Sequence, residues 1–354
     1  MLERAWLDSK QEREDALKLW AGEVLRQPIT LARCAGDAGF RRYYTVDSAP
    51  ELLAVDAPPA SENTPQFVQV AGLLRGAGVA VPDIRAVDVP RGFVLLENFG
   101  SREFGAELDS ERALTLYGEA LFTLLAIAQA PKDVALLPVF DEAFICRELG
   151  LFAEWFVGPL LGLTLNADEK VMLEGVFGRL AMRALEQPQV VMHRDFHSRN
   201  LLIKADGSLG VIDFQDAVVG PVTYDLVSLL RDCYVRLPAA DVRRWALAYG
   251  DMAIDAGVMP PANPDDYLRD FDWMGLQRHI KVLGIFARLH LRDGKSTYLA
   301  DLPRVILYVQ EVAASYPELQ DFAAWFAARI VPACKAQSWY QSQPLSDVNV
   351  MGVI

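Results

Sequence analysis

The chain has 354 residues, of which 52% are hydrophobic and 23% charged, so it has ample apolar material for a folded core. That length favours two domains or lobes over one. The formal net charge of -13 argues against a general nucleic-acid binder, because such a protein needs a basic face to neutralise phosphates.

We expect no targeting or membrane segment in this sequence. Its first residues, MLERAWLDSKQERED, are too charged for a secretory signal, and no apolar run approaches the roughly 20 residues that cross a bilayer. The four cysteines lack the paired spacing of a zinc site or a disulfide scaffold, and we expect them to be buried, reduced thiols. We therefore expect a cytoplasmic protein that binds neither nucleic acid nor membrane and has no obligate protein partner.

Residues 1–100 predict a small, β-rich N-terminal lobe. A helix from about residue 11 to 25 is followed by three short strands in ITLARCAGDAGFRRYYTV and ELLAVDAPP, separated by turn residues. Thr64 as N-cap and Pro65 as the first helical residue open a helix that ends at the glycines of RGAG. Two more strands, in VPDIRAVD and GFVLLENFG, complete the lobe near Gly100.

Residues 101–340 predict a larger, mostly helical lobe, and residues 341–354 a loose tail. Helices are expected in SERALTLYGEALFTLLAIAQA, DEAFICRELGLFAEWF and NADEKVMLEGVFGRLAMRAL, the last with Asn166 and Glu169 as a capping box. Short strands in VVM, LLI and LGVI interrupt these helices. The fold class is therefore α+β, with a small β-rich N-lobe before a large α-helical C-lobe, which is the two-lobed plan of protein kinases.

The stretch VVMHRDFHSRNLLIKADGSLGVIDFQD, residues 190–216, carries the strongest chemical signal. Its Asp195 can accept or orient the proton of an attacking hydroxyl, and Asn200 and Asp213 can hold magnesium, a hard cation that favours oxygen ligands. Aspartate and asparagine are also common turn and cap residues. The order HRD, spaced Asn, hairpin and then IDF is much more specific than any one of these residues.

The pattern departs from protein kinases, because the usual DFG glycine is replaced by glutamine and GPVTYDLVSLL leaves no room for an activation loop. It resembles the aminoglycoside-phosphotransferase-like family of small-molecule kinases, with the order H-x-D-x-x-x-x-N, ID-x-x-D and YDL. That resemblance implies ATP as a cofactor, Asp195 as catalytic base, and Asn200 and Asp213 as ligands of Mg²⁺. It also implies that Tyr224 and Asp225 tie the following helix to the catalytic loop.

The N-lobe lacks the lysine on the third strand and the helix glutamate that normally hold the nucleotide phosphates in kinases. The turn AGDAGF occupies the place of a phosphate loop, where Gly36 and Gly39 allow backbone amides to approach an anion. Arg41 and Arg42 follow, and their side chains face opposite sides of a strand, so at most one reaches the phosphates. Main-chain groups are the candidates for adenine binding at Glu97, Asn98 and Phe99.

Two helical stretches are candidates for the acceptor pocket. In CRELGLFAEWF, a carboxylate and three aromatic rings share one helix face, which suits a sugar ring but also an ordinary core stripe. The helix containing QRHIK carries cations that would bind an anionic substrate group if they face a cleft, and would only aid solubility if they face outward. The candidate substrate residues are Arg147, Glu148, Trp155, Gln277, Arg278 and Lys281.

Several segments together narrow the resemblance: GDAGFRRYY, DAPP, FVLLENFG, RELGLFAEWF, QRHIKVLGIFARL and DLPR. They are similar to the bacterial anomeric kinases of cell-wall recycling, which implies phosphorylation of the C1 hydroxyl of N-acetylmuramate and N-acetylglucosamine. The muramate carboxylate would then meet Arg278 or Lys281. The alternatives are an aminoglycoside kinase, another small-molecule hydroxyl kinase, or a nucleotide-binding module without catalysis.

Overall fold

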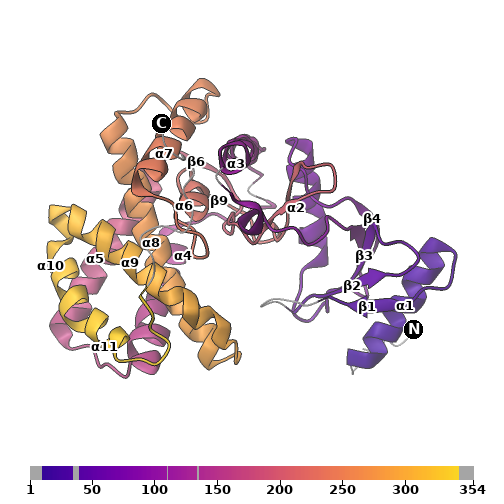
Figure 1. Ribbon diagram of the computed structural model, residues 1–354, viewed down its shortest axis with the longest axis horizontal. Coiled ribbons are helices and arrows are strands. Elements are labelled where there is room, and N and C mark those ends of the chain that lie inside the picture. Colours follow the sequence, from indigo (N-terminus) through magenta and orange to yellow (C-terminus); the bar gives the residue numbers. More distant parts are fainter. Residues whose placement is uncertain (1–9, 35–39, 110, 134, 343–354) are drawn as a thin grey trace. The chain divides into compact units, whose positions relative to one another are not determined.

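The computed structural model describes residues 10–34, 40–109, 111–133 and 135–342. These residues form two compact units. The first contains the described residues up to Ser101 together with Leu202–Gln215, and the second contains Arg102–Leu201 and the described residues from Asp216 onward. The first unit is built on a β-sheet and the second is mostly helical (Figure 1).

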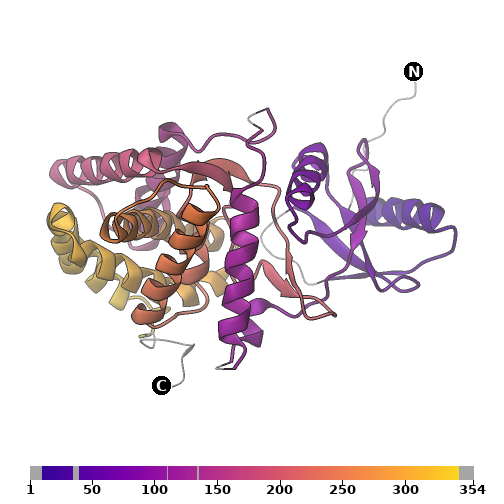
Figure 2. The ribbon, with the colours of Figure 1, turned by 90° about the horizontal axis from the view of Figure 1, so that it is seen from above.

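The first unit is built on a five-stranded antiparallel sheet with the strand order β1-β2-β3-β5-β4. Its strands are β1 (Leu31–Arg33), β2 (Arg42–Val46), β3 (Leu52–Asp56), β4 (Ile84–Asp88) and β5 (Phe93–Glu97). Helices α1 (Lys10–Leu25) and α2 (Thr64–Gly76) cover opposite faces of this sheet (Figure 2). Because side chains alternate along a strand, Tyr44 and Ala54 face α1 and share a core with Leu17 and Trp20.

The start of α2 differs from the sequence prediction by one residue. Asn63, not Thr64, is the N-cap, and its side-chain oxygen accepts a hydrogen bond from Gln66 N at 3.1 Å. Thr64 is already helical and buried. Both residue types cap helices well, so composition alone does not choose between them.

A hairpin that is distant in sequence completes the first unit. It consists of β7 (Leu201–Ile203) and β8 (Leu209–Val211). The sequence places it in the larger lobe, whereas its contacts place its second strand with the first unit: Val211 N donates to Ala80 O at 2.8 Å. Gly210 lies against the Phe99 ring so closely that an added Cβ would be 2.5 Å from it.

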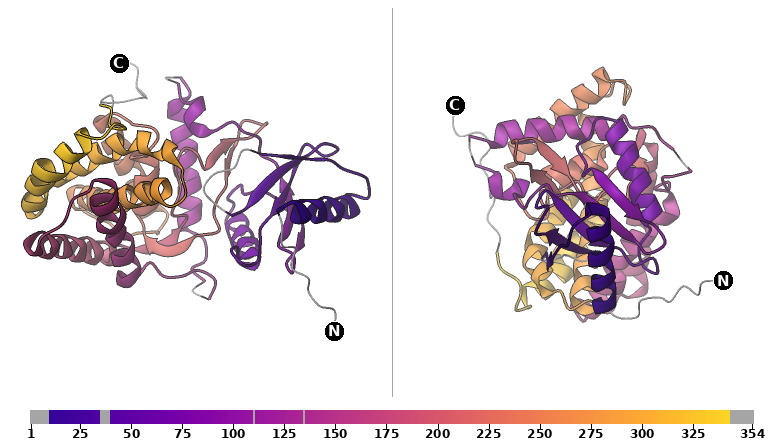
Figure 3. Two further views of the ribbon diagram at one scale, coloured as in Figure 1. Left: turned by 90° about the horizontal axis from the view of Figure 1, so that it is seen from below. Right: turned by 90° about the vertical axis from the view of Figure 1, so that its right-hand side faces the viewer.

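The second unit is helical, and α8 is its central element (Figures 1 and 3). Its helices are α3 (Ala113–Ala128), α4 (Glu142–Leu151), α5 (Ala167–Glu186), α6 (Tyr224–Leu230), α7 (Ala239–Asp255), α8 (Pro264–Leu291), α9 (Leu302–Ser315), α10 (Gln320–Trp325) and α11 (Val331–Lys335), with π-helical segments η2 (Phe152–Leu160) and η5 (Phe326–Ile330) and 3₁₀ turns η1 (Phe104–Glu107), η3 (Ser296–Asp301) and η4 (Pro317–Leu319). Helix α8 contacts α4, η2, α5, α6 and α9. Every residue from Trp273 to Gly284 is buried, so α8 carries its polar residues into the interior. Among the described residues, none of the helices has the length and apolar character required to span a bilayer.

Three details of the structure differ from the sequence prediction. The predicted helix DEAFICRELGLFAEWF divides into α4 and the π-helical η2. The sequence pattern did not predict β9 (Val218–Pro221), whose Gly-Pro ending resembles a turn. This strand pairs with β6 (Gln189–Met192). Two cysteines, Cys233 and Cys334, are buried as expected, but Cys146 is exposed and Cys34 is half-buried. The capping box of Asn166 and Glu169 at the start of α5 is confirmed.

Candidate active site

The loop between β6 and β7 is fixed by a buried carboxylate at the start of α6. Asp225 accepts hydrogen bonds from His193 N at 2.5 Å and from Arg194 N at 2.9 Å. Arg194 has a φ of 76°, a conformation that a side chain with a Cβ rarely adopts, and Arg278 Nη1 donates to its carbonyl at 2.9 Å. The predicted tie between Asp225 and the catalytic loop is confirmed, and it holds an unfavourable backbone conformation in place.

Asp195 presents its carboxylate from this fixed loop. Its own carbonyl accepts from Asn200 Nδ2 at 2.9 Å, and its N–H donates to His193 Nδ1 at 3.3 Å. The side chain is 39% exposed, and Arg278 Nη1 lies 3.8 Å from its Oδ1. Both main-chain groups are therefore anchored while the carboxylate stays accessible to a reacting group.

The cations around Asp195 keep it ionised. Desolvation by the surrounding protein acts to raise the pKa of this carboxyl, but the nearby cationic groups, chiefly Lys281 and Arg278, outweigh it, so the pKa lies well below the usual range. Asp195 is thus a carboxylate at neutral pH, ready to accept a proton.

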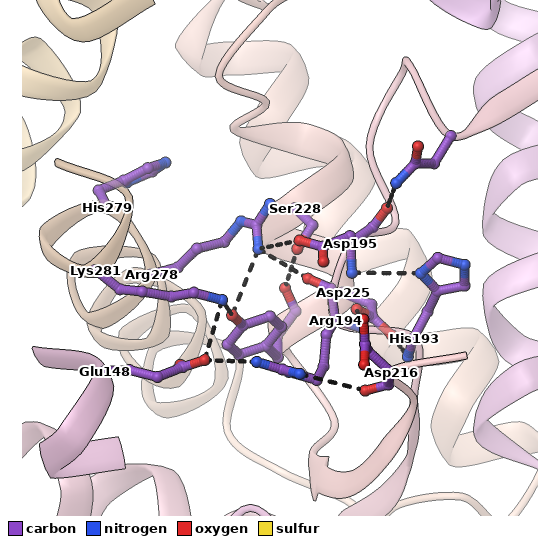
Figure 4. A network of polar contacts seen from close by, with 12 residues as sticks. Glu148, His193, Arg194, Asp195, Asp216, Asp225, Ser228, Arg278, His279 and Lys281 are labelled. Carbon is purple, nitrogen blue, oxygen red and sulfur yellow. Dashed lines mark hydrogen bonds and ion pairs between the residues drawn. The ribbon is translucent and has the colours of Figure 1, made fainter. Parts of the chain in front are cut away.

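The same cations form a buried network with α4 (Figure 4). Lys281 Nζ lies 3.2 Å from Glu148 Oε1 and donates to the Tyr224 hydroxyl at 2.9 Å. Arg194 Nη2 donates to the same Glu148 oxygen at 2.7 Å. Desolvation acts to raise the pKa of Glu148, but Lys281 and Arg194 outweigh it and lower the pKa. Burial acts to lower the pKa of Lys281, whereas Glu148 and Tyr224 raise it. Both groups therefore remain charged despite burial.

The structure brings four of the six predicted substrate residues together: Glu148, Gln277, Arg278 and Lys281. Gln277 Nε2 reaches Glu148 Oε2 only at 3.5 Å. The other two lie elsewhere on α4 and η2: Arg147 is exposed, with its guanidinium 5.2 Å from the centre of the Phe144 ring, and Trp155 is half-buried. The network therefore lies between α4 and α8.

The predicted aromatic face divides into core and surface. Phe152 and Phe156 are fully buried and stack with ring centroids 5.6 Å apart. They form the ordinary core stripe that the sequence left as an alternative, rather than a sugar platform.

Asp232 also shapes the loop, and the sequence pattern did not reveal it. Its carboxylate accepts from Ser198 N at 2.8 Å and from Tyr234 N at 2.8 Å. Nothing in the local sequence distinguishes it from an ordinary aspartate after a helix end.

The predicted nucleotide residues belong to the first unit, where the two arginines have different partners. Arg42 pairs with the fully buried Asp56, which also receives Arg13 Nε at 2.9 Å. Arg41 Nη2 lies 2.8 Å from Glu62 Oε2. Gly36 and Gly39 lie outside the described residues.

The candidate adenine segment ends β5. Glu97 N donates to Asp83 O at 2.8 Å, and Asn98 N donates to Glu51 O at 2.8 Å. Phe99 is buried against Gly210. The main chain of this segment is therefore firmly held within the first unit.

The residues implied as magnesium ligands suit that ion. Among the described residues no three His, Cys, Asp or Glu side chains are grouped to hold a metal. Magnesium takes few protein ligands and completes its shell with phosphates and water. The Asn200 amide nitrogen is used by the Asp195 carbonyl, so its Oδ1 is the atom suited to a cation. Asp213, at a φ of 63°, supplies a carboxylate that accepts from Gln215 Nε2 at 2.8 Å. An amide oxygen and a carboxylate are each ligand types that magnesium accepts.

Comparison with known sequences gives a consistent result. The model of the phosphotransferase enzyme family matches residues 30–261. The N-acetylmuramate/N-acetylglucosamine kinase of Pseudomonas aeruginosa is 42% identical over 325 residues, covering 91% of this chain and 94% of the relative. The kinases of the same name from Pseudomonas putida and Neisseria meningitidis are 41% and 37% identical, covering 91% and 87% of this chain and 94% and 93% of those relatives.

Solved structures confirm the predicted fold class. An ADP-bound aminoglycoside phosphotransferase superposes with a TM-score of 0.57 at 14% identity, covering 84% of this chain and 98% of its own. An ethanolamine kinase of Plasmodium vivax superposes with a TM-score of 0.58 at 12% identity, covering 83% of this chain and 84% of its own. At such identities the likeness concerns the fold alone.

Proposed function

Because this chain belongs to the phosphotransferase enzyme family, we propose that it is an ATP-dependent kinase acting on the anomeric C1 hydroxyl of N-acetylmuramate and N-acetylglucosamine. The observation that carries the phosphoryl-transfer chemistry is the ionised, accessible Asp195 carboxylate on a rigidly held loop. The relatives that share about two-fifths of its residues over nine-tenths of the chain support the choice of acceptor. Such a reaction belongs to the recycling of cell-wall amino sugars in the cytoplasm, where ATP is made.

Asp195 acts as the proton acceptor in this proposal. The C1 hydroxyl is more acidic than other sugar hydroxyls, because the ring oxygen withdraws electron density. Asp195 takes its proton as the C1 oxygen forms a bond to the γ-phosphorus, and the bond from that phosphorus to the ADP oxygen breaks in line with it. A carboxylate with a low pKa suits a loose transition state, in which the proton moves late. When bound, Mg²⁺ held by Asn200 and Asp213 would neutralise charge on the phosphates.

The burial of the predicted acceptor residues suggests two different roles. Glu148, Gln277, Arg278 and Lys281 are all buried and bonded to protein groups, so we propose that they position Asp195 and its loop. Arg147 is the exposed cation of the set, and we propose that it meets the muramate carboxylate, with Trp155 beside the sugar ring. Main-chain groups of Glu97, Asn98 and Phe99 would bind adenine.

The test is magnesium-dependent ADP release with N-acetylmuramate, N-acetylglucosamine and an aminoglycoside in parallel, with the reducing end of each sugar assayed. Turnover of an amino sugar with loss of its reducing end supports the proposal. Asp195→Asn should keep ADP affinity and lower kcat by at least about 1,000-fold, since it removes the proton acceptor. Turnover with the aminoglycoside alone would leave the kinase chemistry and overturn the acceptor. Nucleotide binding without any turnover would identify a binding module.

A further inference from the structure

The first unit contains an ion pair in the region where kinases hold nucleotide phosphates, although the expected residues are missing. No lysine lies between Lys18 and Lys132, and α2 contains no acidic residue. Arg41 precedes β2 directly, and Glu62 lies two residues before α2. Their side chains meet at 2.8 Å and are only 11% and 13% exposed.

The sheet register places Arg41 beside the strand that carries the lysine in kinases. Arg42 is opposite Asp56 and Tyr43 is opposite Val55 in the β2–β3 pair. Continuing that register by one residue sets Arg41 opposite Ala57, at the end of β3. An arginine directly before the neighbouring strand β2 can thus supply the charge that β3 lacks.

The two arginines are on opposite faces because side chains alternate along a strand. Arg42 is on the face covered by α1, where it shares the buried Asp56 with Arg13. Arg41 is on the face covered by α2, with its guanidinium 5.2 Å from the centre of the Phe67 ring. Arg42 is therefore committed to a buried structural cluster, whereas Arg41 is not.

Asp213 lies near Arg41, because both are close to Phe67 and Tyr43. Phe67 stacks on Phe214, the residue after Asp213, with ring centroids 5.0 Å apart. Burial raises the pKa of the Tyr43 phenol to about 12, with Arg41 acting to lower it and Asp213 to raise it, so Tyr43 senses both charges. The Arg41 guanidinium and the Asp213 carboxylate thus lie near each other on the face of the sheet that α2 covers.

We propose that Arg41, oriented by Glu62 and Phe67, replaces the missing lysine and binds the α- and β-phosphates of the nucleotide. A guanidinium has five N–H donors in a rigid fork, so one edge can pair with Glu62 while another binds phosphate oxygens. The Phe67 ring stabilises the guanidinium by a cation–π contact. This proposal rests on the nucleotide use in the proposed function, but it assigns the role to one arginine and names its partner.

The test compares the affinities for MgADP and for adenosine by titration calorimetry, with no acceptor sugar present. Arg41→Met should weaken the affinity for MgADP by roughly 10- to 100-fold, because the phosphates lose a charged hydrogen bond. The affinity for adenosine, which has no phosphates, should stay unchanged. Arg41→Lys should recover part of the affinity, and Glu62→Gln should lose several-fold. Arg85→Met is the matched control, since Arg85 is a strand arginine with a 63% exposed side chain, and it should bind as wild type.

The melting temperature distinguishes the roles of Arg41 and Arg42. Arg42→Met should lower the Tm by roughly 5 °C or more, because it removes a partner of a buried carboxylate, and Arg41→Met should lower it less. The proposal is overturned if Arg41→Met binds MgADP with wild-type affinity or if its affinity for adenosine falls equally. It is also overturned if the wild-type protein binds neither MgADP nor adenosine. A selective loss of MgADP affinity would support the role of Arg41 even if no amino sugar were phosphorylated, so the two proposals can fail separately.

Discussion

The Lys281 ammonium lies 3.2 Å from the Glu148 carboxylate, and the two side chains are only 4% and 9% exposed. A buried charge is costly unless it is paired and hydrogen-bonded. Here the pair joins α8 to α4, and Arg194 and Tyr224 supply further hydrogen bonds. Because Lys281 also lowers the pKa of Asp195, this contact links helix packing to the ionisation of the proposed base.

Lys281→Met should therefore reduce kcat with both amino sugars, by roughly 10- to 100-fold. In wild type, the pKa of Asp195 lies below its usual range, so kcat/KM should show no acid limb in the ordinary range of aspartate. Removing Lys281 raises the pKa of Asp195 and should move the acid limb to higher pH. The measurement is kcat/KM against pH for the variant and wild type.

Lys170→Met is the control, because Lys170 is an exposed lysine on α5 and its loss should leave the profile unchanged. A rise in the KM for N-acetylmuramate alone, with an unaltered kcat, would contradict the positioning role. Lys281 would then contact the substrate carboxylate directly.

Asp225→Asn should destabilise the fold and slow catalysis together. The wild-type carboxylate receives two backbone N–H groups, whereas an asparagine has one side-chain oxygen to accept them. Loss of a hydrogen bond to a charged group should lower the free energy of unfolding by about 2–3 kcal/mol. Urea unfolding and steady-state kinetics measure both effects, and we expect kcat to fall more than KM rises.

The exposed Asp251→Asn on α7 should alter neither quantity. Unchanged stability and unchanged kcat in Asp225→Asn would show that the loop keeps its conformation without the carboxylate.

The sequence predicted those features that depend on neighbouring residues. Most of the strands, the capping box at Asn166 and the order of Asp195, Asn200 and Asp213 are local patterns with a local physical cause. The ion pairs of Glu148 with Lys281 and of Arg41 with Glu62 join residues that are far apart along the chain. Tertiary packing brings these residues together, so their spacing in the sequence does not predict the contacts.

The same reason explains the errors. The predicted helix ends in the π-helical η2, which packs against α8, a contact between segments far apart along the chain. The polar residues of α8 were equally compatible with a solvated face and a buried network. Only the burial of the whole segment from Trp273 to Gly284 decides between them.

Glu169→Gln should destabilise the second unit in a pH-dependent way. The Glu169 carboxylate accepts from Asn166 N at 2.8 Å and from Trp325 Nε1 at 2.8 Å, and it lies 2.7 Å from Arg329 Nε. Desolvation acts to raise its pKa, but these three partners outweigh it and lower the pKa. The contribution is therefore present above the unfolded pKa of about 4.3 and is lost as the pH falls through the lower folded value.

At pH 7 the variant should lose about 1–2 kcal/mol of unfolding free energy, and the difference should shrink as the solution is acidified below pH 4. Chemical unfolding at the two pH values measures it. Glu174→Gln, at an exposed position of α5, is the control. A difference that stays constant with pH would mean that the charge of Glu169 does not contribute.

Gly284→Ala tests the close approach of α8 to the end of α4. A Cβ at Gly284 would lie 2.4 Å from the backbone carbon of Leu151, so one helix must move. We expect a loss of about 2–3 kcal/mol in unfolding free energy. Gly284 lies one turn beyond Lys281, so the displacement should also disturb the Glu148 contact and lower kcat.

Gly175→Ala is the matched control for this change. Gly175 lies in the middle of α5, and an added Cβ there meets nothing within 4 Å. The same substitution should stabilise the protein by about 0.5–1 kcal/mol, because alanine has the higher helix propensity. Opposite signs for the two variants would show that close packing at Gly284, rather than helix propensity, sets the cost. Equal small gains in stability would mean that α8 and α4 are free to separate, and then the Lys281–Glu148 pair could not depend on that approach.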